Sequence, residues 1–413
     1  MDLKLTGATL PGQWGLWDVA IAAGQIQAVA PHLPGAAKQV LHTHGNLVIP
    51  GLVDAHIHLD KALLLDRCRA QTGGFSEALQ QTLQAKQNFT IADIQQRARR
   101  VMAGAIAAGT TTMRSHVEVD PIVGLNNLEA LLPLRDEFAW GLTLQLAVFA
   151  QDGITDQPGS VELLRQAMTL GGDVIGSAPY TDPDPQANIR IIFEIAAEFD
   201  RAIDFHLDFP DDDAPLLLPL VIEETQRRGW QGRVCVGHLT KLTRLPPDEL
   251  EAIARQTADA GISVLALPST DLYMMARQDT HNVRRGVAPI HQLSQWGVNV
   301  GLATNNVLNL FTPFGDGDLL KMCTLLAQVL HLGTPAQHEL CLRMVTDQAA
   351  QAIGIHDVGL APGCRADLVL LNVPSVTEAV GTAPGDRTVI KNGQVVSIRT
   401  TTQQWPLQTS SKV

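Results

Sequence analysis

The feature that most limits the fold of this chain is a set of eight apolar, β-branched runs, each ending in polar residues. Stretches with helical periodicity separate most of them, for example IADIQQRARRVMAGAIAAG and SVELLRQAMTLGG. Strand, helix and strand at this spacing predict parallel strands joined by right-handed crossovers. The runs are Asn46–Asp60, Thr110–Asp120, Thr143–Gln151, Asp173–Tyr180, Ala202–Phe209, Arg233–Leu239, Ser263–Thr270 and Asn299–Asn306.

Eight such units predict a closed (β/α)8 barrel, the TIM-barrel class of α/β fold, over residues 51–359. An open doubly wound sheet is the alternative, but no glycine-rich GxGxxG turn follows an early strand. The two ends of the chain differ from the middle, because they alternate apolar and polar residues around glycine and Asn-Gly turns. We expect residues 1–50 and 360–413 to form one small β-sandwich domain beside the barrel.

The overall charge narrows the class of partner. A net charge of −12 over 413 residues argues against a nucleic-acid partner, because neutralising phosphates requires a basic face.

No apolar stretch has the length of a membrane helix, and the N-terminus lacks the pattern of a secretory signal. Five scattered cysteines without CxxC spacing indicate reduced thiols. We expect a cytoplasmic protein that acts on a small molecule without a membrane partner, and a homo-oligomer remains open.

Four histidines end three of the predicted strands. His56 and His58 are two residues apart, so on a strand both imidazoles point to the same face and can reach one ion. His206 and His238 end the fifth and sixth strands, at the rim where barrels of this type carry their active sites. Imidazoles at this density favour one divalent transition metal, Zn²⁺ or Fe²⁺, over Mg²⁺ or Ca²⁺. His116 ends the second strand as either a substrate-contacting or a packed residue.

The ordered motifs NLVIPGLVDAHIHLDKA, MRSHVEVD, LAVFAQDGI, DFHLDFPDDD, VCVGHLTKL, LATNNVLNLFTPFGDGDL and ADLVLLN resemble one branch of the amidohydrolase superfamily. This branch contains cytosine deaminase and N-isopropylammelide amidohydrolase, and the similarity covers nearly the whole chain. The resemblance implies that His56, His58 and His206 ligate one metal ion and that His238 lies beside its water. It also implies that Gln151 grips the substrate and that Phe311 covers the ring.

Two positions depart from the pattern of this family. Asn305 stands where the family has an aspartate that ligates the metal and takes a proton. An amide can coordinate through oxygen but carries no charge and accepts no proton, so we expect weaker metal binding. Phe209 stands where deaminases of the family have a glutamate. Asp208 should face inward with His206 if the strand alternation continues, which makes it a candidate base, with a structural ion pair as the alternative.

Two functional interpretations follow. In the first, the chain is a metal-dependent hydrolase in which His238 or Asp208 moves a proton while water attacks a cyclic amidine or amide. In this hydrolase interpretation, Asn305 is also one of the catalytic residues. In the second, the chain is a non-catalytic or lapsed relative that binds a small heterocycle. The residues that we expect to contact the pyrimidine- or triazine-like ring in either case are Gln151, His116, Asn306, Phe311 and Phe209.

Overall fold

The centre of the molecule is an eight-stranded parallel barrel. The computed structural model describes residues 1–404, and the remainder of the predicted β-domain range, 405–413, lies outside the described residues. The strands are hydrogen-bonded in chain order, so each neighbour in sequence is also a neighbour in space. They are β6 (Leu52–Ile57), β7 (Thr110–Glu118), β8 (Thr143–Ala150), β9 (Val174–Ser177), β10 (Ala202–Leu207), β11 (Val234–His238), β12 (Ser263–Ala266) and β13 (Val300–Leu302).

The barrel closes through Asn305, which follows the last strand. Its backbone N–H donates to the carbonyl oxygen of His56, and its own carbonyl oxygen accepts from the backbone N–H of His58. Both hydrogen bonds are 2.8 Å long. These two hydrogen bonds form a parallel bridge between Asn305 and Ile57. The closing contact of the barrel therefore lies directly beside the His56–His58 pair.

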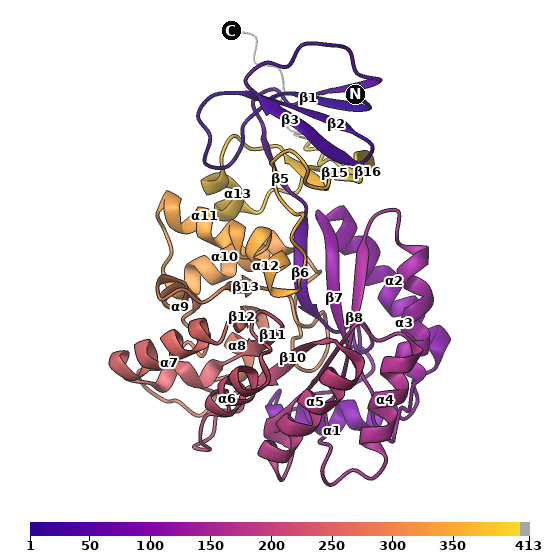
Figure 1. Ribbon diagram of the computed structural model, residues 1–413, viewed down its shortest axis with the longest axis vertical. Helices are drawn as coiled ribbons and strands as arrows, with labels where there is room; N and C mark the ends of the chain where they lie inside the picture. Colours follow the sequence, from indigo (N-terminus) through magenta and orange to yellow (C-terminus); the bar gives the residue numbers. More distant parts are fainter. Residues whose placement is uncertain (405–413) are drawn as a thin grey trace.

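Helices cover the outside of the barrel (Figure 1). Because both faces of the sheet are covered, a strand such as β7 is buried at every position, although its sequence TTTMRSHVE is polar in part. The predicted (β/α)8 class is confirmed. The helices are α1 (Phe75–Lys86), α2 (Ile91–Ala107), α3 (Asn126–Glu137), α4 (Ser160–Leu170), α5 (Pro185–Phe199), α6 (Leu218–Arg228), α7 (Pro247–Asp259), α8 (Pro268–Met274), α9 (Ile290–Gln295), α10 (Leu319–Leu330), α11 (Pro335–Arg343), α12 (Asp347–Ala352) and α13 (Val376–Thr382), with 3-10 turns at Pro179–Thr181 and Thr240–Arg244.

Both ends of the chain build two further sheets at one end of the barrel (Figure 1). Side chains from both ends, including Leu5, Val48 and Leu368, share one apolar core. The boundaries between this β domain and the barrel, which we place at residues 50 and 360 from the sequence, stay a prediction. The strands, in sheet order, are β3 (Gln25–Ala30), β2 (Trp17–Ala22), β1 (Leu3–Ala8) and β4 (Gln39–His42) in one sheet, and β16 (Gln394–Arg399), β15 (Arg387–Lys391), β14 (Leu368–Leu371) and β5 (Leu47–Pro50) in the other.

A buried ion pair and a buried hydrogen bond, both from β15, join one of these sheets to the barrel. The Arg387 guanidinium donates two hydrogen bonds of 2.8 Å to the Asp318 carboxylate, which also caps the N-terminus of α10. Lys391 Nζ donates to Asp367 Oδ2 at 2.7 Å and to the carbonyl of Thr111 at the start of β7. Within residues 1–404, no helix combines the length and the hydropathy that crossing a membrane requires.

Candidate active site

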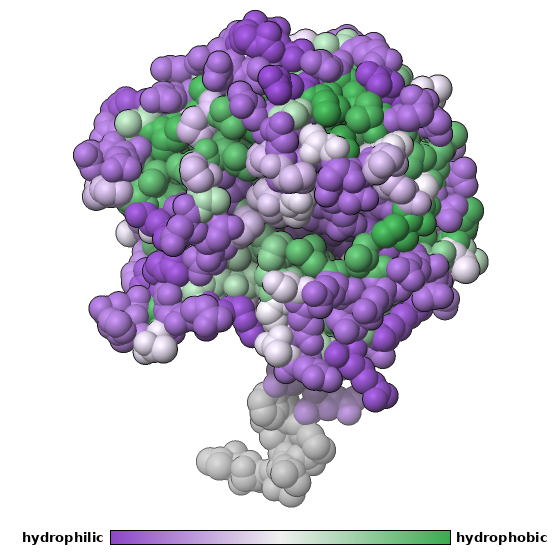
Figure 2. Space-filling view, turned by 90° about the horizontal axis from the view of Figure 1, so that it is seen from below, coloured by the Kyte–Doolittle hydropathy of each residue, from purple (hydrophilic) through white to green (hydrophobic). Residues whose placement is uncertain are grey.

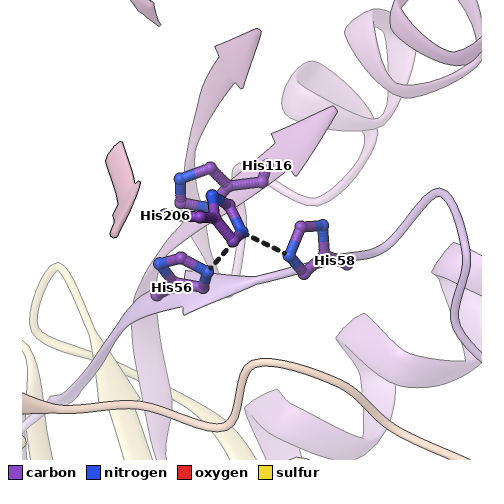
Figure 3. A group of neighbouring side chains, drawn as sticks. All are labelled: His56, His58, His116 and His206. Atoms are coloured by element: carbon purple, nitrogen blue, oxygen red, sulfur yellow. Dashed lines mark hydrogen bonds between the residues drawn. The ribbon is translucent and has the colours of Figure 1, made fainter. Parts of the chain in front are cut away.

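Three histidine rings meet inside the barrel (Figure 3). His56 lies on β6, His58 follows the last residue of that strand, and His206 lies on β10. His206 Nε2 is 3.1 Å from His56 Nε2 and 3.0 Å from His58 Nε2. The ring of His238, at the end of β11, has its centre 5.6 Å from that of His206. The predicted convergence of these four histidines is confirmed.

The three converging nitrogens have the chemistry of a metal-binding set. Burial, together with the neighbouring imidazoles and cationic groups, holds the pKa of His56, His58 and His206 well below its ordinary value. Each ring is therefore neutral at physiological pH and has a lone pair to offer. Two nitrogens bound to one zinc ion at about 2.0–2.1 Å and a tetrahedral angle lie about 3.3 Å apart. The spacing of these rings fits ligands of a single ion.

His116 lies behind this set rather than in the substrate cavity. Its ring is fully buried, with its centre 3.9 Å from that of His56, and it does not line the cavity. This position does not support the substrate contact expected from the sequence. His116 instead belongs to a cluster with His56, His58 and His206 in which one ligand atom from each residue lies within 4.8 Å of the others.

A buried carboxylate supports the cluster from behind. Asp204 Oδ1 lies 3.4 Å from His116 Nε2 and 4.0 Å from His56 Nδ1. Asp204 Oδ2 accepts a hydrogen bond of 2.8 Å from Arg114. A carboxylate beside the outer nitrogen of a ligand histidine favours the tautomer whose inner nitrogen is free to bind metal.

Asn305 contributes an amide oxygen without a partner. Its Nδ2 donates to Thr270 Oγ1 at 2.9 Å, whereas its Oδ1 is buried and has no hydrogen bond among the described residues. The φ angle of Asn305 is +61°, in the left-handed region that asparagine tolerates better than most residues. Because Asn305 lines the same cavity as His58 and His206, its free oxygen is suited to complete a ligand set.

His238 is held by a carboxylate that the sequence analysis did not single out. Asp271 Oδ1 lies 2.7 Å from His238 Nδ1, and Asp271 Oδ2 accepts from the backbone N–H of Leu267. The carboxylate places a proton on Nδ1 and leaves Nε2 free. Phe209, where the sequence resemblance leads us to expect a glutamate, packs on His238 with ring centres 4.2 Å apart. The Phe209 side chain therefore contacts the His238 ring and has no group that could carry a proton.

Asp208 does not face the cavity. The strand β10 ends at Leu207, and Asp208 has a φ of +49°, so the alternation of side chains stops before this residue. Its two carboxylate oxygens accept from the backbone N–H groups of Leu217 and Leu218 at the start of α6. Burial raises the pKa of Asp208 to about 6, and these donors oppose the rise. The inward orientation expected by parity is wrong, and Asp208 anchors a helix.

The open space beside the histidines, including its mouth to solvent, measures about 280 Å³. Of the predicted substrate contacts, Gln151, Asn306, Phe209 and Phe311 line it. On the side of the molecule where α1 lies, polar and apolar side chains surround a hollow (Figure 2). Four lining residues were not predicted from the sequence, namely Lys61, Phe75, Tyr180 and Thr270.

The sequence positions of three of these four residues could have indicated that they line the site. Tyr180 and Thr270 end predicted strands, and Lys61 comes three residues after His58, just past the first predicted strand, so each stands at the rim of the barrel. Phe75 begins α1, far from any strand end, and no pattern marked it. Its ring packs against Phe209 and Phe311, with centres 5.3 and 6.2 Å apart.

Comparisons with known proteins agree with this geometry. A family model described as "Amidohydrolase family" matches residues 47–396. The chain is 27% identical to N-isopropylammelide isopropyl amidohydrolase of Pseudomonas sp. (strain ADP), across 96% of this chain and 97% of that protein. It is 29% identical to pterin deaminase of Rhizobium rhizogenes, across 95% and 91%. The structure of 5-methylcytosine deaminase from Klebsiella pneumoniae with 5-fluorocytosine superposes with a TM-score of 0.92 at 27% identity, covering 98% and 99%.

Proposed function

Because the chain belongs to the amidohydrolase family, we propose that it hydrolyses a C–N bond of a cyclic amidine or amide. The observation that carries this proposal is the meeting of His56, His58 and His206 beside a cavity that also contains His238 and the free amide oxygen of Asn305. The relatives named above are an N-isopropylammelide isopropyl amidohydrolase, a pterin deaminase and a 5-methylcytosine deaminase, which supports a pyrimidine-, triazine- or pterin-like ring as the substrate.

In this proposal, His56, His58 and His206 hold one divalent ion, Zn²⁺ or Fe²⁺. Asn305 completes the set through its amide oxygen, and His116 supports it from behind. When bound, such an ion lowers the pKa of a water molecule and so supplies the nucleophile for hydrolysis. The ion would be held less tightly than by a set with a carboxylate, because Asn305 is neutral.

His238 is the residue that we propose to hold and pass on the proton. Its Nδ1 is hydrogen-bonded to Asp271, so Nε2 is the nitrogen free to exchange a proton with water or with the leaving amine. Burial raises the pKa of Asp271, and its hydrogen bond with His238 opposes that rise. The partner carboxylate orients the ring and stabilises its charged form when a proton arrives.

The remaining lining residues position the ring. Phe209 and Phe311 supply apolar surface for its faces, and Phe75 lies beside both of them. Gln151 and Asn306 contact its polar edge in this proposal. Aromatic walls with a few fixed polar groups are typical of sites for small heterocycles.

One observation favours the alternative, a non-catalytic protein that binds a heterocycle. Both Asn305 and Phe209 line the cavity, and neither accepts a proton. The two interpretations are separated by the metal content of freshly purified protein and by turnover. Ammonia or amine release from a panel of pyrimidines, triazines and pterins supports the hydrolase. Metal-loaded protein that binds these rings but releases neither product contradicts it and supports the alternative.

A further inference from the structure

The segment between β10 and α6 forms a loop whose two ends are held together. Residues 209–216, which we call the strap, have no regular secondary structure. Both carboxylate oxygens of Asp208 accept from backbone N–H groups at the far end of the strap, those of Leu217 and Leu218. A loop of this length with closed ends is an Ω-loop, and its freedom to move lies in its tip.

Asp211 ties the tip to the loop between α8 and α9. Its two carboxylate oxygens accept from the Arg284 guanidinium at 2.8 and 3.0 Å, and one of them also accepts from the backbone N–H of Ala276. Arg284 is held in turn by Asp279, at 2.9 Å. The first residue of the tip is therefore joined to a second loop through a charged hydrogen-bond network.

The next two aspartates tie the tip to the turn that follows β11. Asp212 pairs with Lys241, and Asp213 pairs with Arg244. Lys241 also donates to the carbonyl of Ala214 at 3.0 Å. Three consecutive carboxylates thus pair with three cations from two neighbouring loops.

These ion pairs are the main hold on the tip. Phe209 and Leu216, at the two ends of the strap, pack into apolar clusters, whereas no side chain of residues 210–215 belongs to one. The tip is also exposed, with 93% of the Asp213 side chain accessible to solvent. Exposed ion pairs stabilise little and are screened by salt, so the tip is held weakly and in a salt-sensitive way.

The tip borders the way into the cavity. Pro210, Asp211 and Asp212 line a surface groove together with residues 72–77 and the end of α8. Phe75 lines both this groove and the cavity beside the histidines. Phe209, the first residue of the strap, lines the cavity as well. The strap therefore forms one wall of the groove and, at its base, part of the wall of the cavity.

We propose that the strap is a gate that is latched by ion pairs. Its tip moves away from the barrel when the pairs of Asp211, Asp212 and Asp213 break, and the frequency of this opening sets the access of small molecules to the cavity. The gate stands over the site of the proposed function. Its action is the same for a hydrolase and for a protein that only binds a heterocycle, so its test needs neither turnover nor metal.

The test measures access with a thiol placed in the cavity by Thr270→Cys. The probe is methyl methanethiosulfonate, which is small and neutral, so salt does not steer it. Peptide mass spectrometry separates labelling at position 270 from that of the native cysteines, of which four of five are buried. Raising NaCl from about 0.1 to 1 M shortens the Debye length from about 10 to about 3 Å. We expect labelling at position 270 to become at least about threefold faster.

A triple variant removes the latch. With Asp211→Asn, Asp212→Asn and Asp213→Asn together, each lost pair should favour opening about two- to fivefold, so labelling should become about ten- to a hundredfold faster. The matched control removes three exposed pairs on outer helices with the same change of charge, and its rate should stay within about twofold. It combines Glu137→Gln, Glu198→Gln and Glu251→Gln.

A charge swap tests the pairing itself. Arg244→Glu should accelerate labelling, and adding Asp213→Arg should bring the rate back towards that of the starting chain, because the pair is restored with its signs exchanged. A double variant that labels faster than Arg244→Glu alone overturns the latch.

Hydrogen exchange of the strap peptide in the otherwise wild-type chain gives a second measurement, which also serves if Thr270→Cys does not fold. Its amides should exchange faster in 1 M NaCl and in the triple aspartate variant. The gate is overturned if neither condition changes this exchange, or if labelling accelerates while strap exchange does not. Equal acceleration of labelling in both triple variants also overturns it, since net charge would then be the cause.

Discussion

Replacing Asn305 with aspartate tests whether this residue belongs to the metal-binding set. The two side chains have nearly the same shape, and the amide NH2 of Asn305 now donates to Thr270 Oγ1 at 2.9 Å. The Thr270 hydroxyl can rotate and donate to a carboxylate instead, although it also shares a hydrogen bond of 2.6 Å with Thr312 Oγ1. The substitution therefore mainly adds a negative charge where the unpaired Oδ1 lies.

The added charge should act in opposite directions with and without metal. Loss of a residue that supports a metal ligand typically changes metal affinity ten- to hundredfold, and we expect at least that change here, which corresponds to about 1.4 to 2.8 kcal/mol. Without metal, a buried carboxylate lacking a full set of partners should destabilise the fold by more than the about 1 to 3 kcal/mol typical of a neutral unsatisfied group. Asn305→Asp should therefore unfold more easily than wild type in EDTA and should gain more stability when metal is added.

The assay is urea unfolding with EDTA and with saturating Zn²⁺ or Fe²⁺, combined with competition against a metal-binding dye. Asn306→Asp is the matched control, because it adds the same charge one residue away on a side chain whose oxygen is occupied. An equal gain in metal affinity for both variants would show that the charge acts through space and would refute the assignment of Asn305 as a ligand.

Three further outcomes follow from the described contacts. His238→Asn should reduce turnover about 10²- to 10⁴-fold with unchanged metal content, and a loss of metal instead would contradict its role with protons. Arg387→Met should lower the free energy of unfolding in urea by about 3 to 5 kcal/mol, since it leaves a buried carboxylate unpaired; a change below about 1 kcal/mol would contradict this. Burial opposes ionisation of Glu118, but its buried lysine partners outweigh burial and hold its pKa at about 2, so wild-type stability should decline as pH falls from about 4.5 towards 2. Above pH 4.5, the Lys86→Met variant should show the opposite pH dependence and become more stable as pH falls from 7 to about 5. A urea midpoint of this variant that does not change between these pH values would refute the role of Lys86 in this buried ion-pair network.

Much of the fold could be predicted from the sequence because the barrel strands are buried on both faces and read as apolar runs. The resemblance to amidohydrolases is confirmed by the family model over residues 47–396. His56, His58, His206 and His238 could be placed together because each stands at or beside the end of a parallel strand, and those ends meet at one rim.

Each of the errors has its own physical origin. Alternation of side chains predicts direction only while the backbone stays extended, and Asp208 adopts a positive φ one residue after its strand ends. His116 does point inward, but the sequence does not say how deep in the barrel a side chain lies, and this ring is covered by the others. Phe75 reaches the cavity from a helix, so only the tertiary fold brings it there.

The seam between the first and last barrel strands has a consequence for how the site comes into being. The hydrogen bonds that join Asn305 to His56 and His58 link segments from opposite ends of the barrel sequence. Contacts with large separation along the chain form late, after the entropy of closing a long loop has been overcome. Without that seam, the His56–His58 pair lacks its amide neighbour Asn305. An ion that recognises the complete set would therefore bind only chains that have finished folding, and its binding would favour the closed barrel over open intermediates.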